Sequence, residues 1–294
     1  MSEVTALVTT AWLAEHLNDP NVQIVDASYF VAGGVAEAKR LYAEAHIPGA
    51  AFFNIDTFAD TTKPKIHAFP TAAIFAEKAG KLGIGNQHHI VAYDRLGGTC
   101  AAARAWFMFR AFGHDNVSVL DGGFDKWSAE KRPLTTDVPT FAPESFQARA
   151  VPNQVLDKEH VLANISAQKF QVLDARSKGR FEGAEPEPRA GLKSGRIPAS
   201  CNLPFTNLID ATTKTWKDPP ALRQSFAASG VDLAKPLVTT CGSGVSACAL
   251  AFGAYLAGKS DTVIYDGSWV EWGADGGLPV QTGPEAARDG KDTP

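Results

Sequence analysis

One cysteine in a glycine-containing loop is the strongest candidate for chemistry in this chain. Cys241 opens the segment Cys-Gly-Ser-Gly-Val-Ser-Ala, which ends at Ala247. The β-branched, apolar run 236–240 predicts a buried parallel strand, and residues 246–258 carry small and apolar residues at helical spacing. The glycines let backbone N–H groups turn toward the cysteine, and the start of a helix adds partial positive charge. Because this environment favours an anion, we expect Cys241 to act as a thiolate nucleophile.

Three other interpretations of the loop compete with this one. A buried cysteine is commonly an inert packing residue, but packing does not require a loop that exposes its amides. Gly242-x-Gly244-x-x-Ala247 after a strand also fits a dinucleotide-binding fingerprint, although only about 50 residues follow it. A phosphatase of the Cys-x5-Arg type needs arginine at position 247, where this chain has alanine. The loop therefore favours a nucleophile.

Length and composition limit the class of protein. The 294 residues suit two domains of ordinary size, and 45% hydrophobic with 20% charged residues is typical of globular proteins. The net charge of −4 gives no reason to expect nucleic acid or an anionic membrane as a partner. No run approaches the roughly 18 apolar residues of a membrane span. The amino terminus lacks the features of a secretory signal. The four cysteines, Cys100, Cys201, Cys241 and Cys248, show no disulfide pattern. Both observations predict a cytoplasmic protein.

Four sequence landmarks recur in the same order at an offset of about 150 residues. They are a strand that ends in an acid, an Ile-Pro turn, a second apolar strand and an Asp-Gly before tryptophan. Helical stretches at 10–17, 71–82 and 101–112 alternate with these strands. The pattern predicts a duplicated α/β domain with a mostly parallel sheet covered on both faces. The paired landmarks are Asp26 with Asp174, 46–50 with 196–200, 90–93 with 237–240, and 121–123 with 266–267.

The join between the copies is predicted in 131–154, which holds four prolines and few helical signals. We expect domains at 1–132 and 155–282, an extended linker at 133–154 and a tail at 283–294, with a loose, polar chain from about Leu278. The first copy carries Asp94 where the second has Cys241, so catalysis is assigned to the second domain. The first domain is expected to wall the cleft and lend side chains across it.

Three motifs together resemble the two-domain rhodanese-type sulfurtransferases. They are the Cys241 loop, the segment from Gly179 to Arg189, and 266–269 (Asp-Gly-Ser-Trp). The chain is more narrowly similar to the 3-mercaptopyruvate sulfurtransferases, because thiosulfate-preferring relatives place charged residues directly after the cysteine. The likeness covers residues 5 to 280, approximately. It implies an α/β fold of two tandem rhodanese-like domains, each a mostly parallel sheet flanked by helices.

The resemblance also implies a reaction. Cys241 would take sulfur from 3-mercaptopyruvate as a persulfide, release pyruvate, and pass the sulfur to cyanide, a small thiol or a protein thiol such as thioredoxin. Arg180 and Arg189 would bind the carboxylate and keto oxygen of the donor, although without the resemblance they read as solvated arginines paired with Glu182, Glu185 or Glu187. Backbone amides would stabilise the negative sulfur; they belong to Gly242, Gly244, Val245, Ser246 and Ala247.

A proton-handling triad completes the implied site. Ser243, His67 and Asp56 resemble the triad proposed for the family, and the last two come from the first domain, so the site would straddle both domains. Sequence alone does not select His67 among seven histidines. Cys248 is expected to pack or, as an alternative, to resolve an oxidised Cys241.

Other features of the chain lead to weaker expectations. Cys100 and Cys201 are expected to be inert. The turn 196–200 departs from the His-Ile-Pro-Gly-Ala pattern of the family, so altered local geometry is expected there. No metal site and no organic cofactor are predicted. Three functional alternatives stay open: a thiosulfate:cyanide sulfurtransferase, a persulfide carrier without small-donor turnover, and an inactive interaction scaffold.

Overall fold

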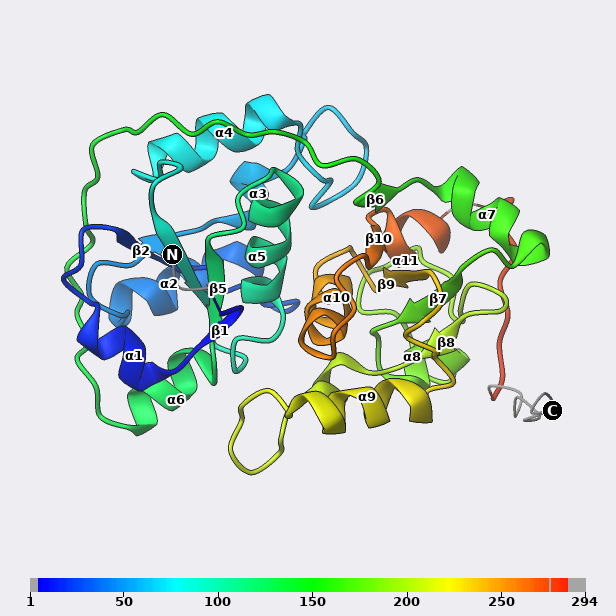
Figure 1. Ribbon diagram of the computed structural model, residues 1–294. Helices are drawn as coiled ribbons and strands as arrows, with labels where there is room; N and C mark the ends of the chain where they lie inside the picture. Colours follow the sequence, from blue (N-terminus) through cyan, green and yellow to red (C-terminus); the bar gives the residue numbers. More distant parts are fainter. Residues whose placement is uncertain (1–4, 275, 285–294) are drawn as a thin grey trace.

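Two α/β domains, each built on a five-stranded sheet, make up the chain in the computed structural model, which describes residues 5–274 and 276–284 (Figure 1). The first sheet has the strand order β1-β5-β4-β2-β3 and the second the order β6-β10-β9-β7-β8. These are the same order, with each strand of one sheet matching the strand five places later in the other. Every strand pair in both sheets is parallel. The predicted fold class is confirmed.

The first domain has the strands and helices that its sequence pattern predicts. The expected helices at 10–17, 71–82 and 101–112 are present and are one or two residues shorter at an end. Two of them begin directly after a threonine whose side chain accepts a hydrogen bond from the first turn, Thr9 for α1 and Thr71 for α4. In chain order the elements are β1 (Leu7–Val8), α1 (Thr10–Glu15), β2 (Val22–Asp26), α2 (Gly34–Glu44), β3 (Ala51–Phe52), α3 (Ile55–Phe58), α4 (Ala72–Lys81), β4 (His89–Tyr93), α5 (Ala101–Ala111), β5 (Val117–Leu120) and α6 (Gly123–Ala129).

The second domain repeats this alternation after the linker. Its elements are β6 (Val155–Leu156), α7 (Lys158–Ala167), β7 (Gln171–Asp174), α8 (Lys178–Glu182), β8 (Cys201–Asn202), the 3-10 helix η1 (Phe205–Leu208), α9 (Pro219–Ala228), β9 (Leu237–Thr240), α10 (Ala247–Leu256), β10 (Val263–Tyr265) and α11 (Ser268–Trp272). No helix among the described residues is both long and apolar enough to cross a membrane.

The central strands are mostly apolar because helices cover both faces of each sheet. Along β4, Ile90 and Ala92 belong to one buried cluster, whereas Val91 and Tyr93 belong to another on the opposite face. Successive side chains of a strand point to opposite faces, so a strand buried on both sides needs an apolar residue at every position. This explains why the strands could be read from the sequence as unbroken apolar runs.

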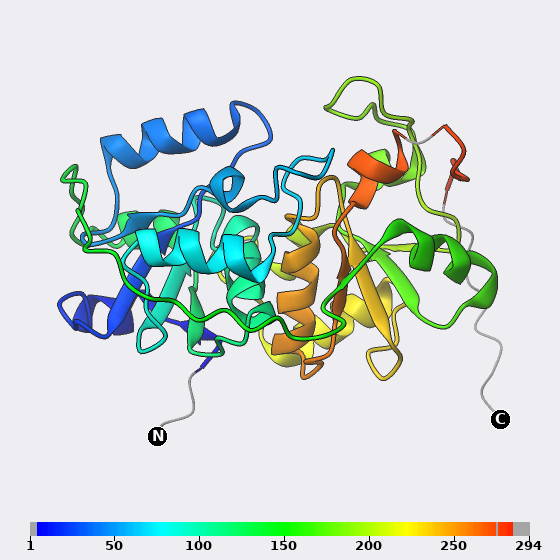
Figure 2. The ribbon, with the colours of Figure 1, turned by 90° about the horizontal axis from the view of Figure 1, so that it is seen from above.

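The helices α5 and α10 pack side by side where the two domains meet (Figures 1 and 2). The rings of Trp106 and Phe252 meet edge to face with their centroids 4.7 Å apart, and a single buried cluster runs through both domains here. Each helix follows a loop at the carboxyl end of a central strand, the Asp94 loop after β4 and the Cys241 loop after β9. Helix packing therefore brings the two loops to the same boundary.

The linker and the carboxyl-terminal segment are both held against the domains. Residues 133–154 pass around the outside of the first domain and over α4 (Figure 1), where Glu144 N–H donates to Gly80 O at 2.9 Å. The expectation of a loose chain from Leu278 is wrong for residues 278–284. Arg196 and Gln281 exchange two backbone hydrogen bonds of 2.9 and 3.0 Å, as His46 and Thr135 do in the first domain. The rest of the predicted tail, 285–294, lies outside the described residues.

The turn at 196–200 keeps the geometry of its counterpart despite its different sequence. Gly49 has φ +78° and Ala199, at the equivalent place, has φ +62°. Alanine in this left-handed region costs about 1 kcal/mol or more, so the turn is conserved at some cost in stability. The expected change in local geometry is not observed. Arg196 instead donates to the carbonyl oxygens of Gly283 and Pro284, which secures the carboxyl-terminal segment.

Candidate active site

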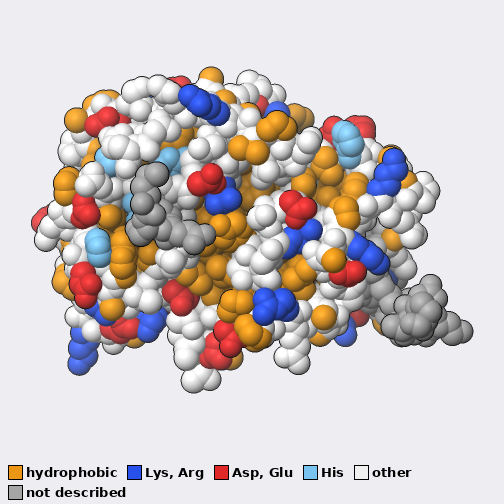
Figure 3. Space-filling view, viewed as in Figure 1, with side chains coloured by type: hydrophobic (Ala, Val, Ile, Leu, Met, Phe, Trp, Pro, Cys, Tyr) orange, Lys and Arg blue, Asp and Glu red, His pale blue; other side chains and the backbone are white. Residues whose placement is uncertain are grey.

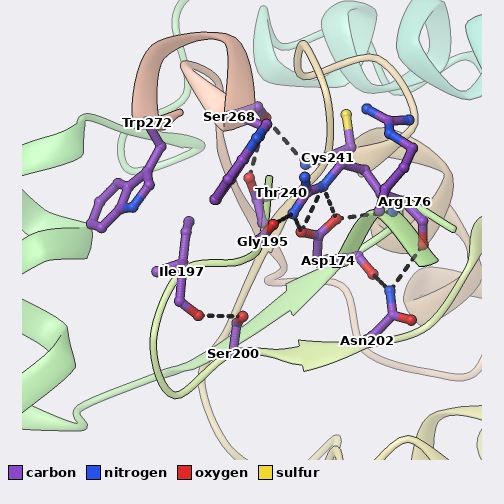
Figure 4. A network of polar contacts seen from close by, with 12 residues as sticks. Asp174, Arg176, Gly195, Ile197, Ser200, Asn202, Thr240, Cys241, Ser268 and Trp272 are labelled. Atoms are coloured by element: carbon purple, nitrogen blue, oxygen red, sulfur yellow. Dashed lines mark hydrogen bonds and ion pairs between the residues drawn. The ribbon is translucent and has the colours of Figure 1, made fainter. Parts of the chain in front are cut away.

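The sulfur of Cys241 lies at the floor of a cavity and is fixed by the backbone around it. Gly244 N–H donates to Sγ at 3.1 Å, and the backbone N–H of Cys241 donates to Ser268 Oγ at 3.2 Å. Gly244 has φ +80°, and a Cβ there would lie 2.9 Å from the carbonyl oxygen of Asp266, so this close turn requires glycine. Figure 4 shows the sulfur pointing away from the polar network around Asp174. The thiol is therefore presented to the cavity although it is only 2% exposed.

The cavity above the sulfur has a volume of about 230 Å³ and takes its walls from both domains. Tyr29, Leu96 and Cys100 come from the first domain. Of the residues whose amides are predicted to stabilise the sulfur, Gly242, Val245 and Ser246 line the wall, and so does Ser243 of the predicted triad. The other two lie behind it, where Gly244 contributes its N–H and the carbonyl of Ala247 accepts a hydrogen bond from Thr239.

The equivalent loop in the first domain indicates what this backbone geometry binds. The Asp94 carboxylate accepts five backbone N–H groups at 2.8–3.0 Å, from Leu96, Gly98, Cys100, Ala101 and Ala102. A strand, loop and helix start of this kind is thus a cradle for an anion. Because β4 and β9 hold the same place in the two sheets, we expect the Cys241 loop to favour a negatively charged sulfur in the same way.

Two arginines predicted to bind the donor face the same cavity. Both guanidinium groups approach Gly242, whose added Cβ would lie 3.2 Å from Arg180 Nη2 and 3.8 Å from Arg189 Nη1. Arg180 Nη2 also donates to Glu187 Oε2 at 2.6 Å, so the ion pair considered from the sequence is present. Glu187 is itself held by the buried Arg176 at 2.8 Å. The ion pair therefore orients Arg180 at the cavity and does not withdraw it into solvent.

Among the charged side chains that line the cavity and their ion-pair partners, one positive charge is in excess. Three guanidinium groups, of Arg176, Arg180 and Arg189, stand against the carboxylates of Asp174 and Glu187. Within the described part of the chain Arg189 forms no ion pair, and its Nη2 donates to the hydroxyl of Tyr29 at 3.3 Å. A small anion entering the cavity would meet an unpaired cation directly.

The predicted triad is assembled across the domain boundary. His67 Nδ1 lies 3.1 Å from Ser243 Oγ, and His67 Nε2 lies 3.1 Å from Asp56 Oδ1. A carboxylate can only accept, so Nε2 carries the proton of the neutral ring and Nδ1 accepts the hydroxyl proton of Ser243. Burial, together with the charges of Arg104 and Arg189, lowers the pKa of His67 to about 4. At neutral pH the imidazole is therefore uncharged and suited to relay a proton.

A buried arginine that sequence reasoning missed connects the catalytic loop to the triad. Arg104, on α5, is 1% exposed and donates to Gly244 O at 3.1 Å, to His67 O at 2.9 Å and to Asp266 Oδ1 at 3.0 Å. Burial raises the pKa of Asp266, but Arg104, Lys65 and the N–H of Phe69 outweigh burial and lower it. Arg104 is the one charged residue in the apolar run 101–109, a pattern that signals a buried and paired charge.

Comparison with known proteins places the chain in a family. Residues 9–130 and 157–275 each match the family described as the rhodanese-like domain. The chain belongs to the rhodanese-like family. It is 47% identical to the 3-mercaptopyruvate sulfurtransferase of Homo sapiens over 91% of each chain, and 44% identical to the thiosulfate sulfurtransferase of Cricetulus griseus over the same shares. SseA from Escherichia coli, solved as an example of the rhodanese fold of 3-mercaptopyruvate sulfotransferases, superposes with a TM-score of 0.80 at 34% identity, covering 90% of this chain and 99% of SseA.

The other cysteines of this rhodanese-like protein are less suited to act as nucleophiles. Burial raises the pKa of Cys248 to about 12, and its Sγ contacts the carbonyl oxygen of Gly244 at 3.4 Å. Burial, then Asp94 and Cys241, hold the pKa of Cys100 well above its usual range, although Cys100 lines the cavity. Cys201 is buried in the core at the start of β8. Among the residues with described positions, no group of three His, Cys, Asp or Glu side chains could hold a metal ion.

Arg189→Ala should weaken the use of a carboxylate-bearing donor by this rhodanese-like protein. Losing a direct guanidinium–carboxylate contact costs roughly 2–4 kcal/mol, which is about 30- to 1,000-fold in kcat/KM. We expect most of the change in KM for the donor, because a carboxylate is a part of the substrate that does not react. Arg40→Ala on the exposed face of α2 removes the same charge far from the cavity and is the control. An equal loss of kcat/KM in the two variants would mean that only the overall electrostatic field of the protein had changed.

The stability of this rhodanese-like protein should fall between pH 6.5 and pH 4 because of His67. The unfolded chain binds a proton at His67 below about 6.5, whereas the folded chain does so only near 4, so acid favours unfolding in this window. The loss amounts to about 3 kcal/mol and is complete below pH 4. Urea unfolding of the protein and of His67→Asn at pH 7 and pH 4 measures it. Asparagine tolerates the φ of +53° found at this position. A difference between the two proteins that does not change with pH would contradict the prediction.

Proposed function

We propose that this protein takes sulfur from 3-mercaptopyruvate onto Cys241 and passes it to a thiol or to cyanide. The observation that carries the proposal is the cavity above the Cys241 sulfur, in which two guanidinium groups meet a nucleophile held by a backbone N–H. The relative from Homo sapiens is named for this reaction and is 47% identical over nearly the whole length of both chains. A keto acid of seven non-hydrogen atoms suits the small volume of the cavity.

The arginines would orient the donor for attack on its sulfur. With the carboxylate against Arg189 and the keto oxygen toward Arg180, the sulfur on C3 would lie nearest to Cys241. Cys241 Sγ then attacks that sulfur, the C3–S bond breaks, and its electron pair forms the enolate of pyruvate. The positive charge of Arg180 stabilises the enolate oxygen, which is more negative than the keto oxygen of the bound donor.

The triad would manage the single proton of this step. The donor thiol loses a proton as its sulfur joins Cys241, and the enolate gains one at C3 to become pyruvate. Ser243 borders the cavity and can accept this proton while it passes its own to His67. Since the pKa of His67 is about 4, the imidazolium forms only briefly, with Asp56 as its counter-charge. The relay returns the proton to the product.

The persulfide would be held as an anion until the acceptor arrives. Gly244 N–H already lies 3.1 Å from Sγ, and the loop holds the same place in its sheet as the one that cradles the Asp94 carboxylate. The outer sulfur projects into the cavity, where the excess positive charge stabilises it. Donor and acceptor therefore react in turn with one sulfur site, which predicts ping-pong kinetics.

A donor comparison combined with intact mass tests this function. Incubation with 3-mercaptopyruvate should add one sulfur atom to Cys241, and a thiol or cyanide should remove it. Steady-state rates with 3-mercaptopyruvate and with thiosulfate then identify the donor. A clear preference for thiosulfate would overturn the proposed donor, and absence of any adduct would point to a carrier that receives its sulfur from a partner.

Thiosulfate remains the second candidate donor because of a specific comparison. The thiosulfate sulfurtransferase of Cricetulus griseus is only three percentage points less identical than the mercaptopyruvate enzyme. The residues that directly follow the cysteine, Gly242 and Ser243, carry no charge to match the second negative charge of thiosulfate. A keto acid with one carboxylate fits the single excess cation better.

A further inference from the structure

A second cavity adjoins the candidate active site and has no role in the proposed donor reaction. It has a volume of about 430 Å³ and lies between the domains, with Gly97 and Asp125 on one side and Ile209 and Lys214 on the other. Leu96 and Phe205 line both this cavity and the smaller one above Cys241. The two spaces therefore share a wall, and we call the larger one the outer groove.

The outer groove is built by a hairpin that reaches from the second domain to the first. Ile209 and Trp216 pair across the hairpin, and Asp210 accepts the N–H groups of Thr212 and Thr213 at 2.9 and 2.8 Å. Trp216 N–H donates to Asp121 of the first domain at 2.9 Å. The loop before α9 extends beneath the first domain in Figure 1. The groove is thus a fixed feature of the domain boundary.

The cavity above Cys241 and the outer groove differ in volume and therefore suit ligands of different size. Small-molecule sites commonly enclose roughly 300–1,000 Å³, and the outer groove falls in this range while the cavity above Cys241 does not. Once the outer sulfur of a persulfide occupies part of the inner cavity, an acceptor larger than cyanide must place most of its body elsewhere. The groove behind Leu96 and Phe205 is the adjoining space.

The charges of the groove indicate the chemistry of that acceptor. Lys214 is exposed and offers an ammonium group, Asp125 offers a carboxylate, and Leu96, Phe205 and Ile209 supply an apolar surface between them. A ligand with both a carboxylate and an ammonium group matches this pair. On the face shown in Figure 3, positive and negative side chains are intermixed, in places next to one another, and none forms a large patch of a single sign.

We propose that the outer groove binds the acceptor as a zwitterionic thiol of the amino-acid or short-peptide class. This rests on the proposed function. The acceptor carboxylate pairs with Lys214, its ammonium group with Asp125, and its thiol passes Leu96 and Phe205 to reach the persulfide. The thiol sulfur forms a bond to the outer sulfur, the bond to Cys241 Sγ breaks and leaves a thiolate, and the thiol proton moves to the outer sulfur. No net oxidation or reduction occurs.

Lys214→Glu tests the groove with three acceptors of different chemistry. We expect kcat/KM for glutathione, a zwitterionic peptide thiol, to fall about tenfold or more because repulsion replaces attraction. The values for 2-mercaptoethanol, which has no charged group, and for cyanide should stay within about twofold of the unmodified protein. Lys131→Glu is the matched control, since Lys131 is also exposed, also has a left-handed backbone with φ +54°, and lies outside the groove.

A second variant tests volume without changing charge. Thr206→Trp places a large side chain at an exposed position on the groove wall, and it should impair glutathione but leave cyanide transfer and sulfur loading of Cys241 intact. Unchanged glutathione kinetics in both variants would overturn the groove as acceptor site while loading and cyanide transfer still supported the proposed function. If the two variants lose sulfur transfer to the reduced form of thioredoxin but keep transfer to glutathione, the proposal is also overturned. The groove would then be part of a surface that docks a protein. If the unmodified protein forms no adduct at all, the proposed function itself fails.

Discussion

Cys241→Ser should abolish sulfur transfer and leave the fold intact. Serine can accept the Gly244 hydrogen bond and fills nearly the same space, so we expect the free energy of unfolding to change by about 1 kcal/mol or less. A hydroxyl has no comparable nucleophilicity toward sulfur and forms no persulfide, so the rate should drop about 10⁴-fold or more. Intact mass after incubation with 3-mercaptopyruvate and steady-state rates measure the two effects.

Cys100→Ser is the matched control for that substitution. Cys100 lines the same cavity, but its raised pKa keeps it a neutral thiol. This variant should retain most of the transfer rate and the full adduct mass. An adduct that disappears in Cys100→Ser and persists in Cys241→Ser would reverse the assignment of the nucleophile.

Arg104→Met should produce the largest loss of stability among the residues around the site. It leaves the buried Asp266 carboxylate with Lys65 and the N–H of Phe69 but without its guanidinium partner, and breaking such a buried pair costs about 3–5 kcal/mol. It also frees the carbonyl oxygens of Gly244 and His67, which Arg104 holds in place. We therefore expect kcat to fall more than donor affinity, because the catalytic loop and the triad lose their common anchor. Urea unfolding and single-turnover sulfur loading are the measurements.

Two further variants separate positioning from mere folding. Arg104→Met/Asp266→Asn removes both partners and should lose less stability than the sum of the single changes, since no buried carboxylate is left without its guanidinium partner. Arg104→Lys keeps the positive charge but loses the planar guanidinium that reaches three acceptors at once. It should therefore fold well but still load sulfur slowly. Arg104 also helps to lower the pKa of His67, so the histidine should titrate at higher pH in Arg104→Met, as followed by NMR. Additive stability losses with an unchanged His67 titration would exclude the positioning role.

The sequence specified the fold well because the central strands β4 and β9 are buried on both faces. The run 90–93 is apolar at every position and 237–240 is apolar or β-branched, and the loop after the second run can be recognised from Cys241, Gly242 and Gly244. The boundaries of helices were less certain, since their last turns depend on capping contacts of single residues. The predicted looseness from Leu278 failed because backbone pairing with Arg196 leaves no compositional signal.

The candidate site was only partly accessible to sequence reasoning. His67 and Asp56 lie more than 170 residues from Ser243 in the chain, and nothing in their local pattern distinguishes them from other polar residues. They entered through the resemblance alone. Arg104 carried a local signal, a single charge within an apolar helix, but that signal does not name its partners. The outer groove arises from the approach of two loops and has no sequence signature.

The loop of the first domain in which the Asp94 carboxylate occupies the backbone N–H groups predicts a difference in thermal stability between the two domains. In the first domain a tethered carboxylate permanently satisfies the backbone donors, so the local structure gains nothing from loading. In the second domain the Gly244 N–H instead meets Cys241 Sγ, which gains and loses a second sulfur atom during turnover. By linkage, an environment that binds the sulfur-loaded form more favourably than the unloaded form must itself become harder to unfold when the loaded form is present. The second domain should therefore unfold at a higher temperature when Cys241 carries the persulfide, and the unfolding temperature of the first domain should not change.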